Sequence, residues 1–314
     1  MKLDVLSISK TTVGKKDLPR QFNELIRPDL IKRAVEAIQA NSRQPYGAKK
    51  GAGMRASAEL SRRRRDYRGS YGHGISRVQR KILSRRGTNM VWVGAVIPGT
   101  VGGRIAHPPK PYKILSKKIN RKEKRKAIRS AMAATMVRSI VEKRGHIVPK
   151  EYPFIIESKI ESLVQTKAVK AVLERLGLEK ELERASQIKI RAGRGKMRGR
   201  RYKVKKGPLI VVSHVCPLLK TAANIPGVDI VEVNNVNAHV LAPGADIGRL
   251  TLFTEAAVER LAKEGLFMNN YKGPKIEKKK IAAAEKKEEK KPAKKTVQEK
   301  ATPSAKKAGE KTKR

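Results

Sequence analysis

LTLFTEAAVERLAKEG, residues Leu250–Gly265, has the pattern of a strand followed directly by a helix. Leu250–Thr254 is the predicted strand. In the predicted helix Glu255–Glu264 the apolar residues recur at helical spacing, and Gly265 ends it, since glycine readily adopts the left-handed conformation that closes many helices. A second apolar run, Leu209–Ser213, is typical of a strand buried on both faces of a parallel sheet. Strands that alternate with helices predict βαβ units and a parallel sheet with helices on its faces.

The same alternation extends over much of the chain. Further strands are expected at Leu3–Ile8, Phe154–Ile156 and Asp229–Val233. Further helices are expected at Pro28–Ala40, Asn120–Arg144, Thr166–Leu176 and Pro217–Asn224. Pro28 suits the first turn of its helix, where no backbone N–H is needed. The sequence therefore predicts an α/β fold with a mostly parallel sheet.

Positive charge is concentrated in segments that lack this alternation. Residues 41–130 contain 25 Lys or Arg against 3 Asp or Glu, with many glycines and prolines. Such a composition buries too little apolar surface to offset the entropy lost on ordering. We therefore expect residues 42–116 to form a long extended loop, ordered by RNA, within a globular domain of residues 1–271. The Lys-rich residues 272–314 are expected to form a disordered tail.

The net charge of +46 indicates a polyanionic partner, and nucleic acid is the commonest one. The sequence shows neither a signal peptide nor an apolar run of about 20 residues that could span a membrane. The single cysteine, Cys216, lies in an apolar run and is expected to be a buried, inert thiol. These features predict a soluble, reducing compartment and no membrane partner.

Residues 188–207, IKIRAGRGKMRGRRYKVKKG, hold ten Lys or Arg and no acidic residue, with glycines at 193, 195 and 199. Glycine lets the backbone approach a ligand closely, while Arg and Lys neutralise phosphates. Tyr202 is a candidate for stacking on a base. The alternative is a solvated basic loop. The spacing of Gly193–Gly199 fits neither a phosphate-binding loop nor the dinucleotide fingerprint, so nucleotide binding is not expected.

The loop also holds Arg62, Arg63, Arg64 and Arg65 in a row, and five of the chain's twelve aromatic residues, including Trp92. Arginine interleaved with aromatics suits irregular RNA, whose unstacked bases offer flat faces. No candidate recognition helix for duplex DNA is found. The five histidines are scattered, and no nucleophile–base pair is found. No metal, cofactor or catalytic residue is therefore predicted.

Five separated blocks, in order, resemble the family of the fourth protein of the large ribosomal subunit, in its archaeal and eukaryotic form. The blocks are RPDLIKRAVEAIQANSRQPYGAKKGAGMRASAE (Arg27–Glu59), GGRIAHPPK (Gly102–Lys110), KINRKEKRKAIRSAMAAT (Lys118–Thr135), IRAGRGKMRGRRY (Ile190–Tyr202) and LAPGADIGRLTLFTEAAVERL (Leu241–Leu261). The similarity spans roughly residues 1–268. It implies a three-layer α/β domain on the outer surface of the large subunit.

The resemblance also implies a role for each cationic segment. The loop would run into ribosomal RNA through stems at Gly47–Ala58 and Gly102–Pro111. Its tip, within Tyr71–Arg86, would help form the constriction of the peptide exit tunnel beside a neighbouring ribosomal protein. The loop Gly193–Arg201 would grip RNA from the globular side. The expected tunnel-lining residues are Tyr71, His73, Arg77, Val78, Arg80, Arg85 and Arg86.

Charge, glycine content and the resemblance together predict which side chains contact RNA. They are Lys49, Lys50, Arg55, Arg62, Arg63, Arg64, Arg65, Arg68, Arg104, His107, Lys110, Lys117, Lys118, Arg121, Lys122, Arg125, Arg191, Arg194, Lys196, Arg198, Arg200 and Arg201.

We therefore expect a structural, non-enzymatic constituent of the large ribosomal subunit that binds its RNA and supports assembly. The expected partners are large-subunit ribosomal RNA, neighbouring large-subunit proteins and the nascent polypeptide. The expected location is cytoplasmic and ribosome-associated, without self-association. Two alternatives from other classes are a chromatin-type protein that compacts DNA, which the tail alone would fit, and an RNA-modifying enzyme. The sequence leaves an archaeal or a eukaryotic origin open.

Overall fold

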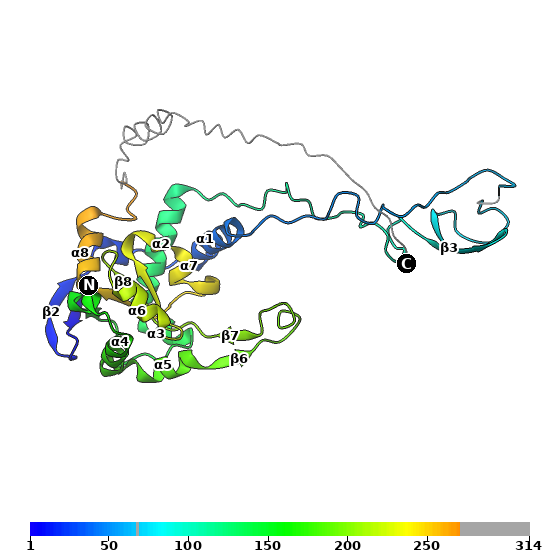
Figure 1. The fold of residues 1–314 in the computed structure, drawn as a ribbon. Coiled ribbons are helices and arrows are strands. Elements are labelled where there is room, and N and C mark those ends of the chain that lie inside the picture. Colours follow the sequence, from blue (N-terminus) through cyan, green and yellow to red (C-terminus); the bar gives the residue numbers. More distant parts are fainter. Residues whose placement is uncertain (67–68, 271–314) are drawn as a thin grey trace, which may run out of the picture. The chain divides into compact units, whose positions relative to one another are not determined.

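The computed structural model describes residues 1–66 and 69–270 (Figure 1). A six-stranded sheet has the strand order β2-β1-β5-β10-β8-β9. Its strands are β1 (Lys2–Leu6), β2 (Thr12–Asp17), β5 (Ile155–Ile156), β8 (Leu209–Val212), β9 (Asp229–Glu232) and β10 (Thr251–Thr254). β2 pairs antiparallel with β1, and the other neighbouring pairs are parallel. The predicted mostly parallel sheet is confirmed.

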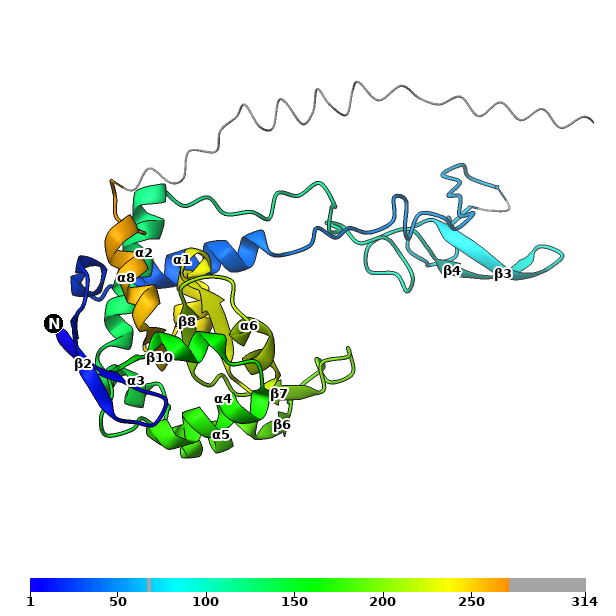
Figure 2. The same ribbon diagram turned by 60° about the vertical axis from the view of Figure 1, so that its left-hand side comes forward.

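Helices cover both faces of this sheet (Figure 2). The first hydrophobic core contains side chains of α1 (Pro28–Asn41), α2 (Arg121–Thr135), α7 (Ala238–Leu241) and α8 (Glu255–Glu264). The second core contains side chains of α3 (Arg138–Lys143), α4 (Thr166–Leu173), α5 (Glu179–Ser186) and α6 (Leu218–Thr221). Short 3₁₀ helices lie at Arg20–Asn23, Ser158–Ser162, Ala222–Asn224, Val233–Asn235 and Pro243–Ala245.

Alternation along the strands produces the two cores. In β8, Leu209 and Val211 lie in the first core, whereas Ile210 and Val212 lie in the second. Successive side chains of a strand point to opposite faces, so a strand covered on both faces has a continuous apolar run. All four side chains are completely buried. The three-layer α/β fold implied by the resemblance is thus confirmed.

The helix predicted at Asn120–Arg144 is wrong in its length, because the structure divides it into α2 and α3. Val137 between them is extended, with φ −94° and ψ 105°. Ala127, Ile128, Ala131 and Met132 of α2 pack in the first core, whereas Val141 of α3 packs in the second. One straight helix cannot cover both faces of a sheet, so the helix breaks where the chain passes from one face to the other.

A helix end and an edge strand also differ from the prediction. The helix predicted at Thr166–Leu176 stops at Leu173, and a π-helical turn, Glu174–Leu178, leads into α5. Gly177 in this turn has φ +84°, which glycine adopts without strain. The edge strand β2 is absent from the prediction because it is almost wholly exposed and shows no alternation of buried residues. It forms through backbone pairing with β1.

The cationic segments contain regular structure that their composition does not predict. Within the long loop, β3 (Arg80–Arg86) and β4 (Asn89–Gly94) form an antiparallel hairpin. Exposed and partly buried residues alternate along β4, a period-two pattern surrounded by glycine and charge. A second hairpin joins β6 (Ile188–Ile190) to β7 (Tyr202–Val204). The tail expected at residues 272–314 lies outside the described residues.

Candidate nucleic-acid interface

Polar contacts close the base of the long loop, which begins after α1 and ends before α2. The side-chain Oδ1 of Asn41 accepts a hydrogen bond from the backbone N–H of Lys117 at 3.0 Å. The Lys117 ammonium lies 3.3 Å from a carboxylate oxygen of Glu36. The two ends of the loop are therefore held together beside the first core.

The two stems of the loop lie against each other. The backbone N–H of Ala48 donates to the carbonyl of Pro109 at 3.0 Å. A Cβ atom added to Gly47 would lie 2.2 Å from Cδ of Pro111, which is closer than any real contact of that kind. Only a residue without a side chain fits between the stems at this point. The two segments that the resemblance assigns to the stems are thus neighbours in space.

The far part of the loop, residues 59–66 and 69–101, lies beyond the stems and is termed the distal unit. It contains the β3–β4 hairpin, and a bridge pairs Glu59 with Arg80 of β3. Ala95 in this unit is only 3% exposed. The loop is therefore extended along its stems and folded in the distal unit, because the hairpin gives the neighbouring segments an edge and a surface on which to pack.

Arginine side chains lie over aromatic rings in the distal unit. The Cζ atom of Arg77 is 4.3 Å from the ring centroid of Tyr71, and that of Arg64 is 5.9 Å from it. The Cζ atom of Arg80 is 5.8 Å from the ring centroid of Trp92. These are cation–π distances. A guanidinium stacked in this way keeps N–H groups at its edge for hydrogen bonds to phosphate.

The second cationic segment is the basic hairpin, formed by β6, β7 and the residues between them. At the connection, the backbone N–H of Arg191 donates to the carbonyl of Arg201 at 2.8 Å. The side-chain Nε of Arg191 donates to the carbonyl of Arg200 at 3.0 Å. Gly193 and Gly199 have φ of +80° and +75°, so the chain turns at both. The segment is therefore an ordered turn, not a featureless basic loop.

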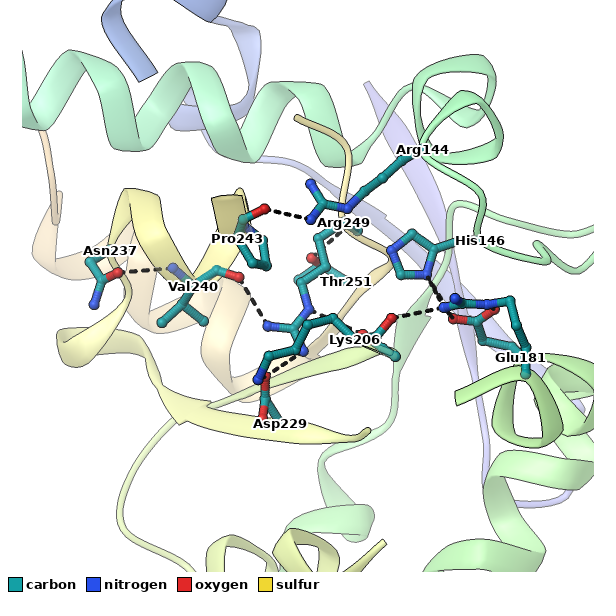
Figure 3. A network of polar contacts seen from close by, with 12 residues as sticks. Arg144, His146, Glu181, Lys206, Asp229, Asn237, Val240, Pro243, Arg249 and Thr251 are labelled. Atoms are coloured by element: carbon teal, nitrogen blue, oxygen red, sulfur yellow. Dashed lines mark hydrogen bonds and ion pairs between the residues drawn. The ribbon is translucent and has the colours of Figure 1, made fainter. Parts of the chain in front are cut away.

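Arg249 fastens one end of the basic hairpin to the body (Figure 3). Its side chain is 1% exposed. Nε donates to the carbonyl of Gly207 at 3.1 Å, Nη1 donates to the carbonyl of Val240 at 3.0 Å, and Nη2 donates to Oδ2 of Asp229 at 2.6 Å. Lys206 donates to the same carboxylate oxygen at 2.9 Å. The chain leaving β7 is thus tied to the first residue of β9 and to α7.

Glu181 of α5, whose side chain is completely buried, is the centre of a second cluster at the same end of the hairpin. His146 Nδ1 lies 2.7 Å from its Oε1, and the backbone N–H of Ile147 donates to Oε2 at 2.9 Å. Arg184 donates to both carboxylate oxygens, at 2.6 and 2.7 Å. Arg184 also donates to the carbonyl of Lys206 at 2.8 Å. Figure 3 shows that this cluster and the Arg249 cluster meet at Lys206.

These contacts set the charges of the two clusters. Burial alone would raise the pKa of Asp229, but the charge of Arg249 and the hydrogen bonds it receives outweigh burial and hold its pKa below the ordinary value. Burial would also raise the pKa of Glu181, but hydrogen bonds from Arg184 and His146 lower it. Burial holds the pKa of His146 below its ordinary value, although Glu181 acts in the opposite direction. Ionised carboxylates and a neutral imidazole are therefore favoured.

The carboxyl edge of the sheet, where open α/β folds bind ligands, is closed by Glu161. Its Oε1 accepts hydrogen bonds from the backbone N–H of Ser213 at 2.9 Å and from the hydroxyl of Thr254 at 2.6 Å. Its Oε2 accepts from the hydroxyl of Ser213 at 2.6 Å. Polar groups at this edge therefore satisfy one another. Cys216 nearby is only partly buried, which corrects the expected full burial, and burial raises the pKa of its thiol.

Within residues 1–66 and 69–270, no three His, Cys, Asp or Glu side chains are grouped as a metal site requires. None of the helices in this part of the chain combines the length and the apolar character that crossing a bilayer requires.

Most of the predicted RNA-contacting side chains are exposed on the loop, on the start of α2 or on the basic hairpin. Arg125 and Arg191 are only partly exposed, and Arg125 donates to the carbonyls of Met268 and Asn269 at 3.1 and 2.9 Å. Arg68 lies outside the described residues. The exposed ones are Lys49, Lys50, Arg55, Arg62, Arg63, Arg64, Arg65, Arg104, His107, Lys110, Lys117, Lys118, Arg121, Lys122, Arg194, Lys196, Arg198, Arg200 and Arg201. Their contact with RNA stays a prediction.

The residues predicted for the loop tip fall in two places. Arg85 and Arg86 lie at the turn end of β3, and the Nε of Arg85 donates to the carbonyl of Gly87 at 2.9 Å. Tyr71 and Arg77 stack on each other outside the hairpin strands. His73 is exposed, whereas Val78 and Arg80 are partly buried. Which of these residues faces a tunnel stays a prediction.

The clusters at the base of the basic hairpin are absent from the prediction. Arg249 offers a signal, since it is a single cation next to the apolar run that forms β10. Buried charges are paired in folded proteins, so an acidic partner is expected, but its position depends on strand order. Asp229 and Glu181 carry no such signal in the sequence.

The long loop and the basic hairpin are two cationic segments that extend from a three-layer α/β body. This arrangement defines a nucleic-acid-binding protein without a recognition helix among the described residues. The chain belongs to the ribosomal protein L4/L1 family, to which residues 17–264 match. It is 51% identical over 268 residues to the large ribosomal subunit protein uL4 of Nanoarchaeum equitans, covering 85% of this chain and 100% of that protein. It is 44% identical over 264 residues to the protein of the same name from Archaeoglobus fulgidus, covering 84% and 99%. With that of Pyrobaculum aerophilum the identity is 46% over 272 residues, covering 85% and 90%.

Proposed function

We propose that this chain is a structural constituent of the large ribosomal subunit, where it binds ribosomal RNA and supports assembly. The proposal depends chiefly on the charge of the long loop and on the contacts that hold its two ends together. The loop holds most of the 25 basic residues of segment 41–130, and contacts at Asn41 and Lys117 close its base. A charged loop held at both ends can enter folded RNA while the α/β body stays outside. Each phosphate neutralised by Lys or Arg releases a counterion, which favours binding.

The basic hairpin supplies a second contact on the same body. Residues 188–207, which include the hairpin, hold ten basic residues and no acidic residue. Arg249 and Arg184 hold the carbonyls at the base of the hairpin, so the cations are presented on an ordered element. Two separated contacts on one body bind more tightly than either alone, provided that both can engage together.

The distal unit is proposed to line the peptide exit tunnel, next to the nascent polypeptide and a neighbouring large-subunit protein. Support comes from its place at the end of the stems and from its exposed apolar strand residues. Val91 and Val93 of β4 are 60% and 40% exposed, and Leu83 of β3 is 61% exposed. The protein acts there as a single copy, in the cytoplasm, with no catalytic step. The domain limits, residues 1–271 with the loop 42–116 and a tail at 272–314, belong to the same proposal.

Competition binding of the full chain tests this proposal against a DNA-compacting role. Labelled large-subunit ribosomal RNA is bound, and unlabelled structured RNA or duplex DNA is added. The proposal predicts that structured RNA displaces the label at far lower concentration, and that deletion of residues 272–314 leaves this preference intact. Equal competition by duplex DNA would favour DNA compaction, and so would loss of RNA binding when residues 272–314 are deleted.

A further inference from the structure

A cavity of about 780 Å³ lies between the two stems of the loop. It exists because the outgoing stem makes two successive turns. The backbone N–H of Ala52 donates to the carbonyl of Lys49 at 3.0 Å, and that of Met54 donates to the carbonyl of Gly51 at 3.0 Å. The stems then meet again, since a Cβ atom added to Gly53 would lie 2.5 Å from Cα of Arg104. The chain thus leaves a space between two points of close contact.

The walls of this space are largely apolar. They include Met54, Ile105, Pro108 and Tyr112. Met54, Ile105 and Tyr112 are 59%, 63% and 74% exposed, which is unusual for large apolar side chains. The volume lies within the range of about 300–1,000 Å³ that small-ligand sites occupy. The cavity can therefore take a flat group of the size of a nucleotide.

The charges around the cavity favour an occupant with negative charge. Four cations line it, namely Lys49, Lys50, Arg104 and Lys110, and no acidic side chain does so among the described residues. The Lys110 ammonium lies 5.6 Å from the ring centroid of Tyr112. An aromatic ring beside cations suits a nucleotide, because the base stacks on the ring while its phosphate is neutralised.

We propose that this cavity holds an unstacked nucleotide of the bound RNA, with its base against Tyr112 and its phosphate among the four cations. The proposal rests on the proposed function, because it requires RNA around the stems. It assigns a purpose to the exposed apolar residues of the stems. It also explains why neutral, bare backbone separates the cations, since Gly51, Ala52 and Gly53 leave room for a base.

The test introduces a photoreactive group at the cavity. Full-length chain with Tyr112→p-benzoylphenylalanine is expressed in cells, large subunits are purified and irradiated, and cross-linked nucleotides are mapped by reverse transcription. Cross-linking should concentrate on one nucleotide or two adjacent ones. The same group at Tyr46, which is 62% exposed but does not line the cavity, is the control and should not mark that nucleotide.

Chemical probing of the same nucleotide gives the second measurement. With Tyr112→Ala its reactivity toward base-specific reagents should rise by about fivefold or more, because a stacking partner is lost. Tyr112→Phe and Tyr46→Ala should leave it unchanged. Cross-links to protein, or scattered cross-links without a change in reactivity, would overturn the proposal. Failure of the unmodified chain to sediment with large subunits would instead count against the proposed function itself.

Discussion

The guanidinium of Arg249 lies 2.6 Å from the carboxylate of Asp229, and the same carboxylate oxygen lies 2.9 Å from the ammonium of Lys206. These three residues come from three parts of the protein. Asp229 begins β9 at the edge of the sheet, Lys206 follows the basic hairpin, and Arg249 precedes β10. The position of the basic hairpin therefore depends on an ion pair formed inside the α/β body.

Replacement of Arg249 by methionine should destabilise the body and loosen the hairpin. Two carbonyls and Asp229 would lose their donor, and breaking a buried pair costs about 3–5 kcal/mol. We expect the lower end, because the Asp229 side chain is 37% exposed and keeps Lys206. Urea unfolding followed by circular dichroism measures the change. Arg175→Met, at an exposed position, is the control and should change stability little.

Contact between the stems can be tested with a single methyl group. Gly47→Ala would place a Cβ atom 2.2 Å from Pro111, so the stems must separate. Relieving such an overlap costs at least about 1 kcal/mol, which is about fivefold in binding. Cells that express variant and wild-type chains together should incorporate the variant into large subunits about fivefold less. Gly14→Ala, whose methyl group would meet nothing within 4 Å, should be incorporated normally.

Stability should fall as the pH falls below 7, because burial keeps the pKa of His146 low. The unfolded chain then binds a proton near the ordinary pKa of about 6.5, while the folded chain does so only at lower pH. The contribution of His146 to the free energy of unfolding is therefore complete above about pH 6.5. It is lost as the pH falls toward the pKa of His146 in the folded chain. The depressed pKa of Glu181 acts in the same direction at lower pH.

Urea unfolding at pH 7.0, 6.0 and 5.0 checks this pH dependence. His146→Gln should flatten the fall of the unfolding free energy over that interval. His107→Gln, on the exposed loop, should leave the fall as it is in the wild type. An unchanged slope for His146→Gln would contradict the assignment.

Neutralising the tip of the basic hairpin should change the salt dependence of RNA binding. Each phosphate contact contributes about 0.7–0.9 to the slope of log affinity against log salt concentration. The triple variant Arg194→Gln, Lys196→Gln, Arg198→Gln should therefore reduce the slope by about 2. Neutralising Lys167 and Lys170, which are exposed on α4, should leave the slope unaltered. The same slope in the triple variant would show that the hairpin does not meet phosphate.

The α/β body is predictable from sequence because burial leaves a regular pattern. The run Leu209–Val212 identifies a central strand, and the helix Glu255–Glu264 carries its own end signal at Gly265. The break at Val137 is not predictable locally, because both flanking segments suit a helix. It follows from the tertiary requirement that the chain change faces of the sheet.

The cationic segments can be identified in the sequence by their charge, but their structure cannot be predicted from it. The β3–β4 hairpin is half exposed, so its alternation is weak against the surrounding glycine and charge. The fastening of the basic hairpin depends on residues far apart in the chain, such as Arg184, Asp229 and Arg249. Only the order of strands in the sheet brings them together, and composition does not encode that order.

Recovery of large ribosomal subunits through a rising salt series tests the central claim most directly. Cells express either the tagged full-length chain or a variant in which a short linker replaces residues 47–111. At a salt concentration that removes loosely bound basic proteins, the full-length chain should remain at one copy per large subunit. The variant should be washed off at that concentration. Loss of the full-length chain at moderate salt, or equal retention of the variant, would contradict a constituent held by its loop.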